Sequence, residues 1–439
     1  MSIRKLKARQ ILDARGVPTV EVDLVTEIGL LRSSVPSAVF PCENEAKEVR
    51  DGDEAAYGGR SVFKVVETIN NVIAPELLKS KLCVNQQREI DLLLQNLDGT
   101  PDKSKLGVNA ILGVSMACCK ASAAKRGLPL YRYIASLCDN NEVCVPVPVF
   151  NVTSGGRAAG NNLVYQEFLI LPTGAQSFAE AMRMGTEVYR ALERQLAEMQ
   201  ELKVPLGIVD TGGFAPELED DAEALVTIDA AISSAGYDGK VSIGINPCAT
   251  AFCKDGMYDM EFKTDESDPE DYLEPDALRE QYAELVGQVP ALVSIEDPFD
   301  QEDWDSWAGL VSQAPELQVV AGELVATNPE RLEEAVERQA ANCLLVKLGQ
   351  VGTVTGAIDC VKAARAAGWG VAVSAGQGET EDTFAADFAV GVSAVQFKAG
   401  APCRSEAVAK YNQILRIEEE LGQQACYVGD KFRGPFAAA

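Results

Sequence analysis

The chain of 439 residues is too long for one small hydrophobic core, and its length predicts two or three domains. Its net charge of −27 repels phosphate backbones and anionic lipid surfaces, which argues against nucleic-acid and membrane binding. No apolar run approaches the roughly 20 residues that span a bilayer, and the charged start MSIRKLKARQ is unlike a secretory signal. We therefore expect a cytoplasmic protein.

Histidine is absent from the sequence, although a chain of this size ordinarily contains several. Its absence removes the commonest general base and the commonest metal ligand together. Compositional drift, selection or engineering would each produce this result. The twelve cysteines include no Cys-x-x-Cys pair, which favours reduced, buried thiols and argues against a structural zinc site.

Residues 1–140 mix a strand-like opening with helical segments. The stretch 19–25 alternates polar and apolar side chains, as a half-buried strand does, and a turn at Gly29 separates it from a second short strand. The apolar, small-residue stretch 109–124 predicts a helix that the Gly-Leu-Pro segment 127–129 ends. This first part of the chain is therefore expected to contain both helices and strands.

From about residue 143 the pattern changes to short apolar runs separated by amphipathic helices, of which 177–201 and 222–235 are the clearest. Eight such runs with intervening helices predict an α/β fold with a parallel β/α barrel. An open doubly wound sheet is the alternative, but the Gly-x-Gly-x-x-Gly fingerprint of that fold is absent. The eight runs are 145–150, 168–171, 241–245, 292–295, 319–321, 344–346, 371–373 and 394–397.

Polar side chains flank these predicted strands, and in such barrels the functional groups lie where the strands end. Buried lysines and glutamates are costly unless they are paired, so one ion pair with a purely structural role is the simplest explanation. Two lysines and two glutamates beside apolar strands favour a functional site instead. The flanking residues are Asn151, Gln166, Glu167, Asn246, Glu296, Lys347, Ser374 and Lys398.

Long segments in both halves of the chain match, in order, the motifs of one protein family. The segments are RGVPTVEV at 15–22, KLGVNAILGVS at 105–115, QEF at 166–168, GGFAP at 212–216, SIEDPFD at 294–300, GETEDTF at 378–384, GAPCRSE at 400–406, KYNQ at 410–413 and RIEEEL at 416–421. Together they resemble the enolase family along nearly the whole chain.

The resemblance implies a C-terminal (β/α)8 TIM-like barrel over residues 141–439, preceded by a small N-terminal α+β domain over residues 1–140. It places the active site at the mouth of the barrel. It also implies a homodimer, although surface ion pairs individually contribute little to its stability. The residues that match positions of ion pairs between subunits are Arg9, Glu21, Glu406 and Arg416.

Enolases remove a carbon-bound proton from 2-phosphoglycerate and expel hydroxide to give phosphoenolpyruvate, with magnesium stabilising the intermediate. Lys347 matches the family's proton-abstracting lysine, and Lys398 matches the lysine that contacts the substrate carboxylate. Glu167 matches a catalytic carboxylate, and Gln166 beside it matches a substrate-binding position. The resemblance thus identifies these four residues as what remains of the family's catalytic site.

The magnesium site departs from the family pattern, in which three carboxylates at the ends of successive strands hold the first ion. Glu296 matches one of them, but the other two positions are Asn246 and Gly322. Glu323 follows directly, yet adjacent strand residues point to opposite faces, so we expect it to be a poor replacement. Because magnesium depends on carboxylate charge, we expect no cofactor, and magnesium only if the protein is an active enolase.

Other family positions are also changed. The acid-side glutamate is replaced by Thr211, the loop histidine by Ala158, and the His-Arg-Ser segment with the phosphate-binding arginine by Ala-Gly-Gln at 375–377. The glycine-containing lid is SAVFPC at 37–42, where Phe40 stands in place of a magnesium-binding serine. Groups that act as a unit leave little activity when several are lost, so we expect catalysis to be absent.

Our first hypothesis is a catalytically silent enolase homologue that serves as a structural or protein-binding component. The protein would then be part of a cytoskeletal or ciliary assembly, a lens-type bulk protein, or an inactive subunit of a larger complex, with an unidentified protein partner. The second hypothesis is an active, magnesium-dependent phosphopyruvate hydratase with a rebuilt site. The third is an anion-binding pocket with a new ligand at Lys347 and Lys398, although we prefer the simpler explanation that Glu167 and Glu296 neutralise these lysines.

Overall fold

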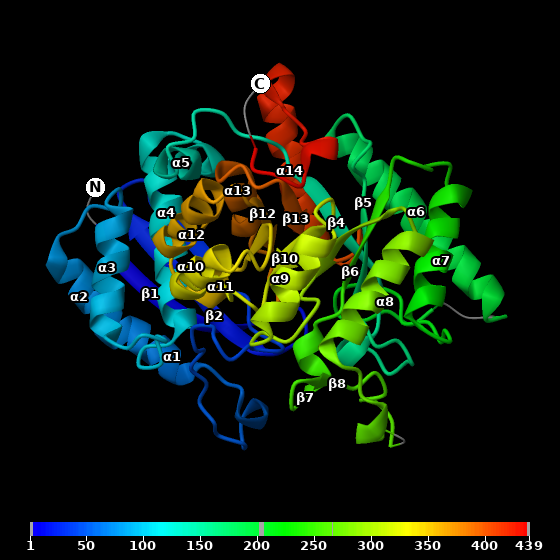
Figure 1. Cartoon of the computed structure of the whole chain (residues 1–439). Coiled ribbons are helices and arrows are strands. Elements are labelled where there is room, and N and C mark those ends of the chain that lie inside the picture. Colours follow the sequence, from blue (N-terminus) through cyan, green and yellow to red (C-terminus); the bar gives the residue numbers. More distant parts are fainter. Residues whose placement is uncertain (1–2, 202–205, 266, 437–439) are drawn as a thin grey trace.

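The computed structural model describes residues 3–201, 206–265 and 267–436. The chain forms a three-stranded antiparallel sheet with helices, followed by a closed eight-stranded barrel (Figure 1). The elements of the first part are β1 (Lys5–Leu12), β2 (Pro18–Thr26), β3 (Gly29–Ser34), α1 (Phe63–Thr68), α2 (Ala74–Ser80), α3 (Gln87–Asp98), α4 (Val108–Arg126) and α5 (Leu130–Leu137).

The predicted strand 19–25 and the predicted helix 109–124 are confirmed as β2 and α4. Helix α4 packs against β2 and β3, and its Gly113 lets the backbones approach, because a Cβ there would lie 2.9 Å from Val22 Cγ2. Gly127 ends the helix in the left-handed conformation that an αL cap requires. None of the helices in the described ranges is long and apolar enough to cross a membrane.

All eight predicted apolar runs are strands of the barrel, whose order around the circle is β10-β11-β12-β13-β4-β5-β6-β9. The barrel strands are β4 (Val147–Ser154), β5 (Glu167–Leu171), β6 (Ser242–Asn246), β9 (Leu292–Glu296), β10 (Gln318–Ala321), β11 (Cys343–Val346), β12 (Gly370–Ser374) and β13 (Gln396–Lys398). A short hairpin, β7 (Cys253–Lys254) with β8 (Met257–Tyr258), lies outside the barrel.

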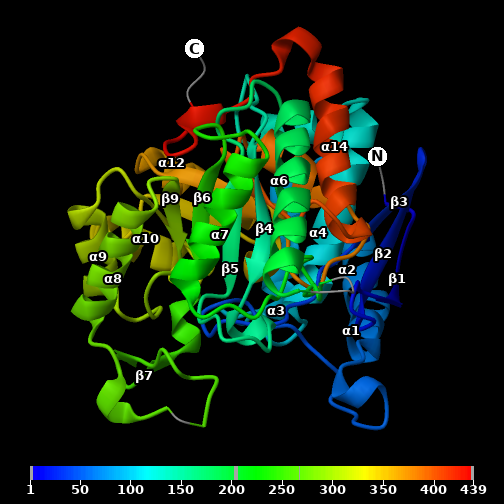
Figure 2. The same ribbon diagram turned by 90° about the vertical axis from the view of Figure 1, so that its right-hand side faces the viewer.

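The helices of this part lie outside the strands, and Figure 2 shows the first and last of the long ones, α6 and α14, side by side. On the other flank, α3, α4 and α5 pack against α11, α12 and α13. The helices are α6 (Phe178–Met199), α7 (Asp221–Ser234), α8 (Pro275–Gln288), α9 (Trp304–Gln313), α10 (Pro329–Glu337), α11 (Leu348–Val351), α12 (Val354–Ala366), α13 (Phe384–Gly391) and α14 (Ser405–Leu421). The predicted helices 177–201 and 222–235 correspond to α6 and α7.

The expectation of an all-parallel barrel is wrong for one strand, because β5 runs antiparallel to both β4 and β6. The link from β4 to β5 contains only one helical turn, Gly156–Ala158, and a parallel pair needs a longer crossover, usually through a helix. Its reversal brings the first residue of β5, Glu167, opposite the last residue of β6, Asn246. Both side chains therefore reach the same mouth of the barrel.

The residues matched to subunit contacts have polar partners within the single chain. Arg9 pairs with Glu21 and Asp23 on the neighbouring strand β2, and Arg404 pairs with Glu406 at 2.9 Å. Arg416 donates a hydrogen bond to Gln413 at 3.2 Å. Dimer formation through these residues stays a prediction.

The contact between α6 and β4 depends on the lack of a side chain at Gly185, where a Cβ would lie 2.6 Å from Phe150 Cδ2. We expect Gly185→Ala to lower the free energy of unfolding by about 1–3 kcal/mol through overpacking. Gly287→Ala in α8 is the matched control, since no heavy atom lies within 4 Å of its Cβ position. The control should raise stability by up to about 1 kcal/mol in urea unfolding. Equal stabilisation by both substitutions would contradict this close packing.

Candidate active site at the barrel mouth

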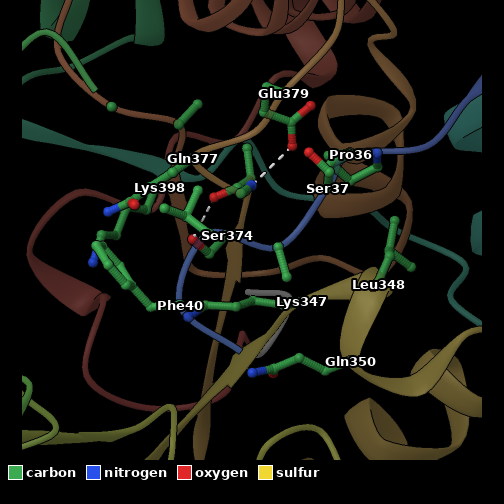
Figure 3. A pocket seen from close by; sticks show the side chains of 18 of the residues that line it. Pro36, Ser37, Phe40, Lys347, Leu348, Gln350, Ser374, Gln377, Glu379 and Lys398 are labelled. Atoms are coloured by element: carbon green, nitrogen blue, oxygen red, sulfur yellow. Dashed lines mark hydrogen bonds between the residues drawn. The ribbon is translucent and has the colours of Figure 1, made fainter. Parts of the chain in front are cut away.

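A cavity of about 170 Å³ lies where the carboxyl ends of most barrel strands meet (Figure 3). Segments of the loop after β3, including Pro36 to Phe40, form one side of it. Seven of the eight polar residues predicted from the strand ends line this cavity. They are Gln166, Glu167, Asn246, Glu296, Lys347, Ser374 and Lys398. The eighth, Asn151, lies behind Glu167 and donates to its Oε1 at 3.4 Å.

Lys398, at the end of β13, lies between the two predicted glutamates. Its Nζ is 2.5 Å from Glu167 Oε2 and 2.8 Å from both carboxylate oxygens of Glu296. The lysine is only 7% exposed, and both glutamates are buried. This ammonium group therefore neutralises a carboxylate pair that would otherwise be buried without a counter-charge.

Asn246 bridges the same two carboxylates from the adjacent strand β6. Its Nδ2 donates to Glu167 Oε2 and to Glu296 Oε1, each at 2.9 Å. An aspartate here would have no donor for either neighbour, and would add a third negative charge. The amide thus fits a site that is held together by Lys398 without a metal ion.

The protonation states follow from this arrangement. Burial is the largest influence on the pKa of Glu167 and would raise it, but the charge and hydrogen bond of Lys398, the hydrogen bond from Asn246 and the charge of Lys347 together outweigh burial and lower the pKa. Burial alone would lower the pKa of Lys398, but Glu167 and Glu296 outweigh it and raise the pKa. Both groups are therefore charged near neutral pH, and they form a true ion pair.

Lys347 precedes α11 and makes no ion pair within the described part of the chain. We expected Glu167 and Glu296 to neutralise both lysines, but among the described residues only Lys398 contacts them directly. Burial would lower its pKa, yet the negative charges of Glu296 and Asp297 outweigh burial and leave the pKa raised.

The third family metal position, Gly322, is closed by another side chain. A Cβ at this residue would lie 2.5 Å from Asp297 Oδ2. The carboxyl group of Asp297 is held there, because its Oδ1 accepts hydrogen bonds from the backbone N–H groups of Gly322 and Glu323 at 2.8 Å. Burial, followed by the charges of Glu323 and Glu296, raises the pKa of Asp297 to about 8.

Glu323 does line the cavity, and the expectation based on strand alternation does not apply to it. Strand β10 ends at Ala321, so Glu323 lies in the turn that follows, where side chains no longer alternate. Its Oε1 accepts a hydrogen bond from Cys248 Sγ at 3.3 Å. Sequence reasoning also missed Glu45, which reaches the cavity from the distant loop after β3.

The residues present do not fit the magnesium of the family. Both oxygens of Glu296 are engaged by Lys398, and Asn246 directs its N–H groups, not its oxygen, toward the carboxylates. Asp297 fills the space beside Gly322. Within the described ranges, no group of three or more Cys, Asp or Glu side chains is arranged to hold a metal ion.

The replaced family positions lie at or near the cavity without restoring its chemistry. Phe40 forms part of the wall, with the Arg157 guanidinium 4.8 Å from its ring centre, but it does not fill the space. Thr211 and the segment 375–377 also line the cavity, and Gly376 N donates to a buried glutamate, Glu379, at 2.8 Å. Ala158 lies in the helical turn after β4.

We expect Lys398→Met to lower the free energy of unfolding at pH 7 by about 3–5 kcal/mol, because two buried carboxylates lose their counter-charge. Lys79→Met removes an exposed pair with Glu76 and should cost at most about 1 kcal/mol.

The pH dependence provides a further check on the same variant. The contribution of Glu167 is present above its ordinary pKa of 4.5 and is lost as the pH falls through the lowered folded value. Without Lys398, burial raises the folded pKa, so the variant should instead gain stability as the pH falls from 7 toward 5. Urea unfolding at several pH values would measure the two slopes, and parallel slopes would contradict the ion pair.

Comparison with protein families agrees with this architecture over most of the chain. The family model described as the enolase N-terminal domain matches residues 3–134. The model described as the enolase C-terminal TIM barrel domain matches residues 142–436. The two matches follow one another in the family's order and cover both the antiparallel sheet with its helices and the barrel. The chain belongs to the enolase family.

Proposed function

We propose that this member of the enolase family is catalytically silent and serves as a structural or protein-binding component. The observation that supports it best is the position of Lys398, whose ammonium group lies between Glu167 and Glu296. A carboxylate that already contacts a buried lysine offers less charge to a divalent cation. Such a site is stable without metal, and it has no need of one.

The remaining groups support the same proposal. Removing a carbon-bound proton next to a carboxylate requires a neutral base together with cations that meet the developing charge. Lys347 has a raised pKa and is charged near neutral pH. No arginine lines the cavity among the described residues, and acidic side chains outnumber its two lysines. A phosphorylated, doubly acidic substrate would therefore meet repulsion.

The scaffold itself retains the features that a binding role needs. The barrel is closed, the core is continuous from β2 through α4 to the barrel helices, and most of the twelve cysteines are buried. We propose that this scaffold forms a homodimer and presents its outer surface to a protein partner in the cytoplasm. Loss of the site chemistry leaves that surface intact.

We expect purified protein with magnesium and 2-phosphoglycerate to form no phosphoenolpyruvate above the rate of its Lys347→Ala variant. The ultraviolet absorbance of phosphoenolpyruvate measures the product, and a conventional enolase under the same conditions is the positive control. Turnover that Lys347→Ala abolishes would show an active enolase and would end the proposal.

Magnesium should also leave the melting temperature unchanged when ionic strength is held constant. A ligand that binds only the folded state adds about 2.7 kcal/mol of stability at one hundred times its dissociation constant, so a functional site would be visible. The control is Glu296→Gln, which removes the one matched metal carboxylate. A magnesium-dependent rise in melting temperature that this substitution removes would count against the proposal.

A further inference from the structure

The charges around the cavity are unbalanced in favour of acid. Two lysines line it, Lys347 and Lys398. The carboxylates that line it are Glu45, Glu48, Glu167, Glu296, Glu323, Glu379 and Asp382. Three of these acids are neutralised by cations outside the cavity: Glu48 by Arg50 at 2.7 Å, Glu379 by Lys410 at 2.9 Å and Asp382 by Lys120 at 2.7 Å.

Of the four other acids, Glu167 and Glu296 share Lys398, and the two without such a contact among the described residues are Glu45 and Glu323. Neither carboxylate makes an ion pair within the described part of the chain, whereas Lys398 is shared by Glu167 and Glu296. Both acids lie near Cys42: burial, then Glu45 and, more weakly, Glu323 raise the pKa of its thiol to about 12, against the opposing charge of Lys347. One lysine thus stands against two acids on this side of the cavity.

Two buried side-chain oxygens in the cavity wall also lack a partner. They are Asn246 Oδ1 and Gln166 Oε1, in residues that are 4% and 7% exposed. The orientation of Asn246 is fixed, because its Nδ2 must face the two carboxylates. Buried polar atoms are rarely left without a partner, so these two oxygens add hydrogen-bond acceptors to a wall in which Lys347 is the lysine without an ion pair among the described residues.

Apolar side chains form another part of the wall, and they include Val39, Phe40, Met116, Leu348 and Phe384. The cavity volume of about 170 Å³ exceeds the roughly 150 Å³ of an engineered protein cavity that accepts benzene. The space therefore suits a short hydrocarbon stem that carries a group rich in hydrogen-bond donors.

We propose that the cavity binds a small organic cation, a primary ammonium or guanidinium group on a short apolar stem. The charged head is held by Glu45 and Glu323, and the unpartnered oxygens of Asn246 and Gln166 accept its remaining hydrogen bonds. The stem packs against Phe40 and its apolar neighbours. The inference rests on the proposed function, because a mouth that holds no magnesium and turns over no substrate is open to another ligand. The net charge of −27 draws cations toward the protein.

Isothermal titration calorimetry of the full chain tests the proposal with n-butylammonium and n-butylguanidinium as ligands, and with butyrate and inorganic phosphate as anions of opposite charge. We expect the cations to bind with one site and the anions not to bind. Tighter binding of either anion, or no binding of either cation, would overturn the inference. Neither result bears on turnover of 2-phosphoglycerate, so the two proposals fail separately.

Single variants locate the binding. Glu45→Gln and Glu323→Gln should each weaken the cation about tenfold, since a hydrogen bond to a charged group contributes about 1.5–3 kcal/mol. Glu333→Gln on α10 is the matched control, because it removes the same charge from an exposed residue far from the cavity wall. If the cation binds equally well to all three variants, it binds elsewhere on the acidic surface and the proposal is wrong.

Short peptides distinguish a free amine from a basic side chain of a partner. A tripeptide with a central lysine or arginine is titrated beside the alkyl cations. Tighter binding of the peptide, lost in Glu323→Gln, assigns the cavity to a partner's side chain, while tighter binding of the alkyl cation assigns it to a free amine. Both results support a cation site, and peptide binding that Glu323→Gln leaves unchanged contradicts it.

Discussion

A buried ammonium group between two buried carboxylates governs the chemistry of this barrel. Lys398, Glu167 and Glu296 come from three different strands, and the low dielectric of the interior makes each of them costly without the others. The three charged side chains are connected to one another, and Asn246 bridges the two carboxylates through its Nδ2, so they form one buried polar network. The cation and the carboxylates thus contribute to the stability of the folded state.

That network also determines which charged groups of the cavity remain without a direct partner. Because Lys398 is fully committed to two acids, the other lysine, Lys347, is the only lining cation, among the described residues, that faces Glu45 and Glu323. The cavity therefore carries surplus negative charge together with oxygen acceptors and apolar side chains.

Much of the fold was predictable from the sequence, because eight apolar runs are sufficient to locate eight barrel strands. Their direction was not, since an apolar run looks the same from either end, and only the short link before Glu167 reveals the reversal of β5. The polar residues at the strand ends were predictable as well, because the apolar runs also locate where each strand ends. Glu45 was not, because a loop far away in the sequence brings it to the site, and Glu323 was misjudged because the strand ends two residues earlier.

The position of the Asp297 carboxyl group limits which side chains residue 322 can have. Its carboxyl group sits where any side chain at position 322 would begin, and two backbone N–H groups fix it there. A side chain reintroduced at Gly322 would require the Asp297 carboxyl group to move, and an aspartate there would add repulsion next to a carboxyl group that is already hard to ionise. Positions 297 and 322 are thus coupled, because the side-chain conformation of Asp297 determines what position 322 can hold.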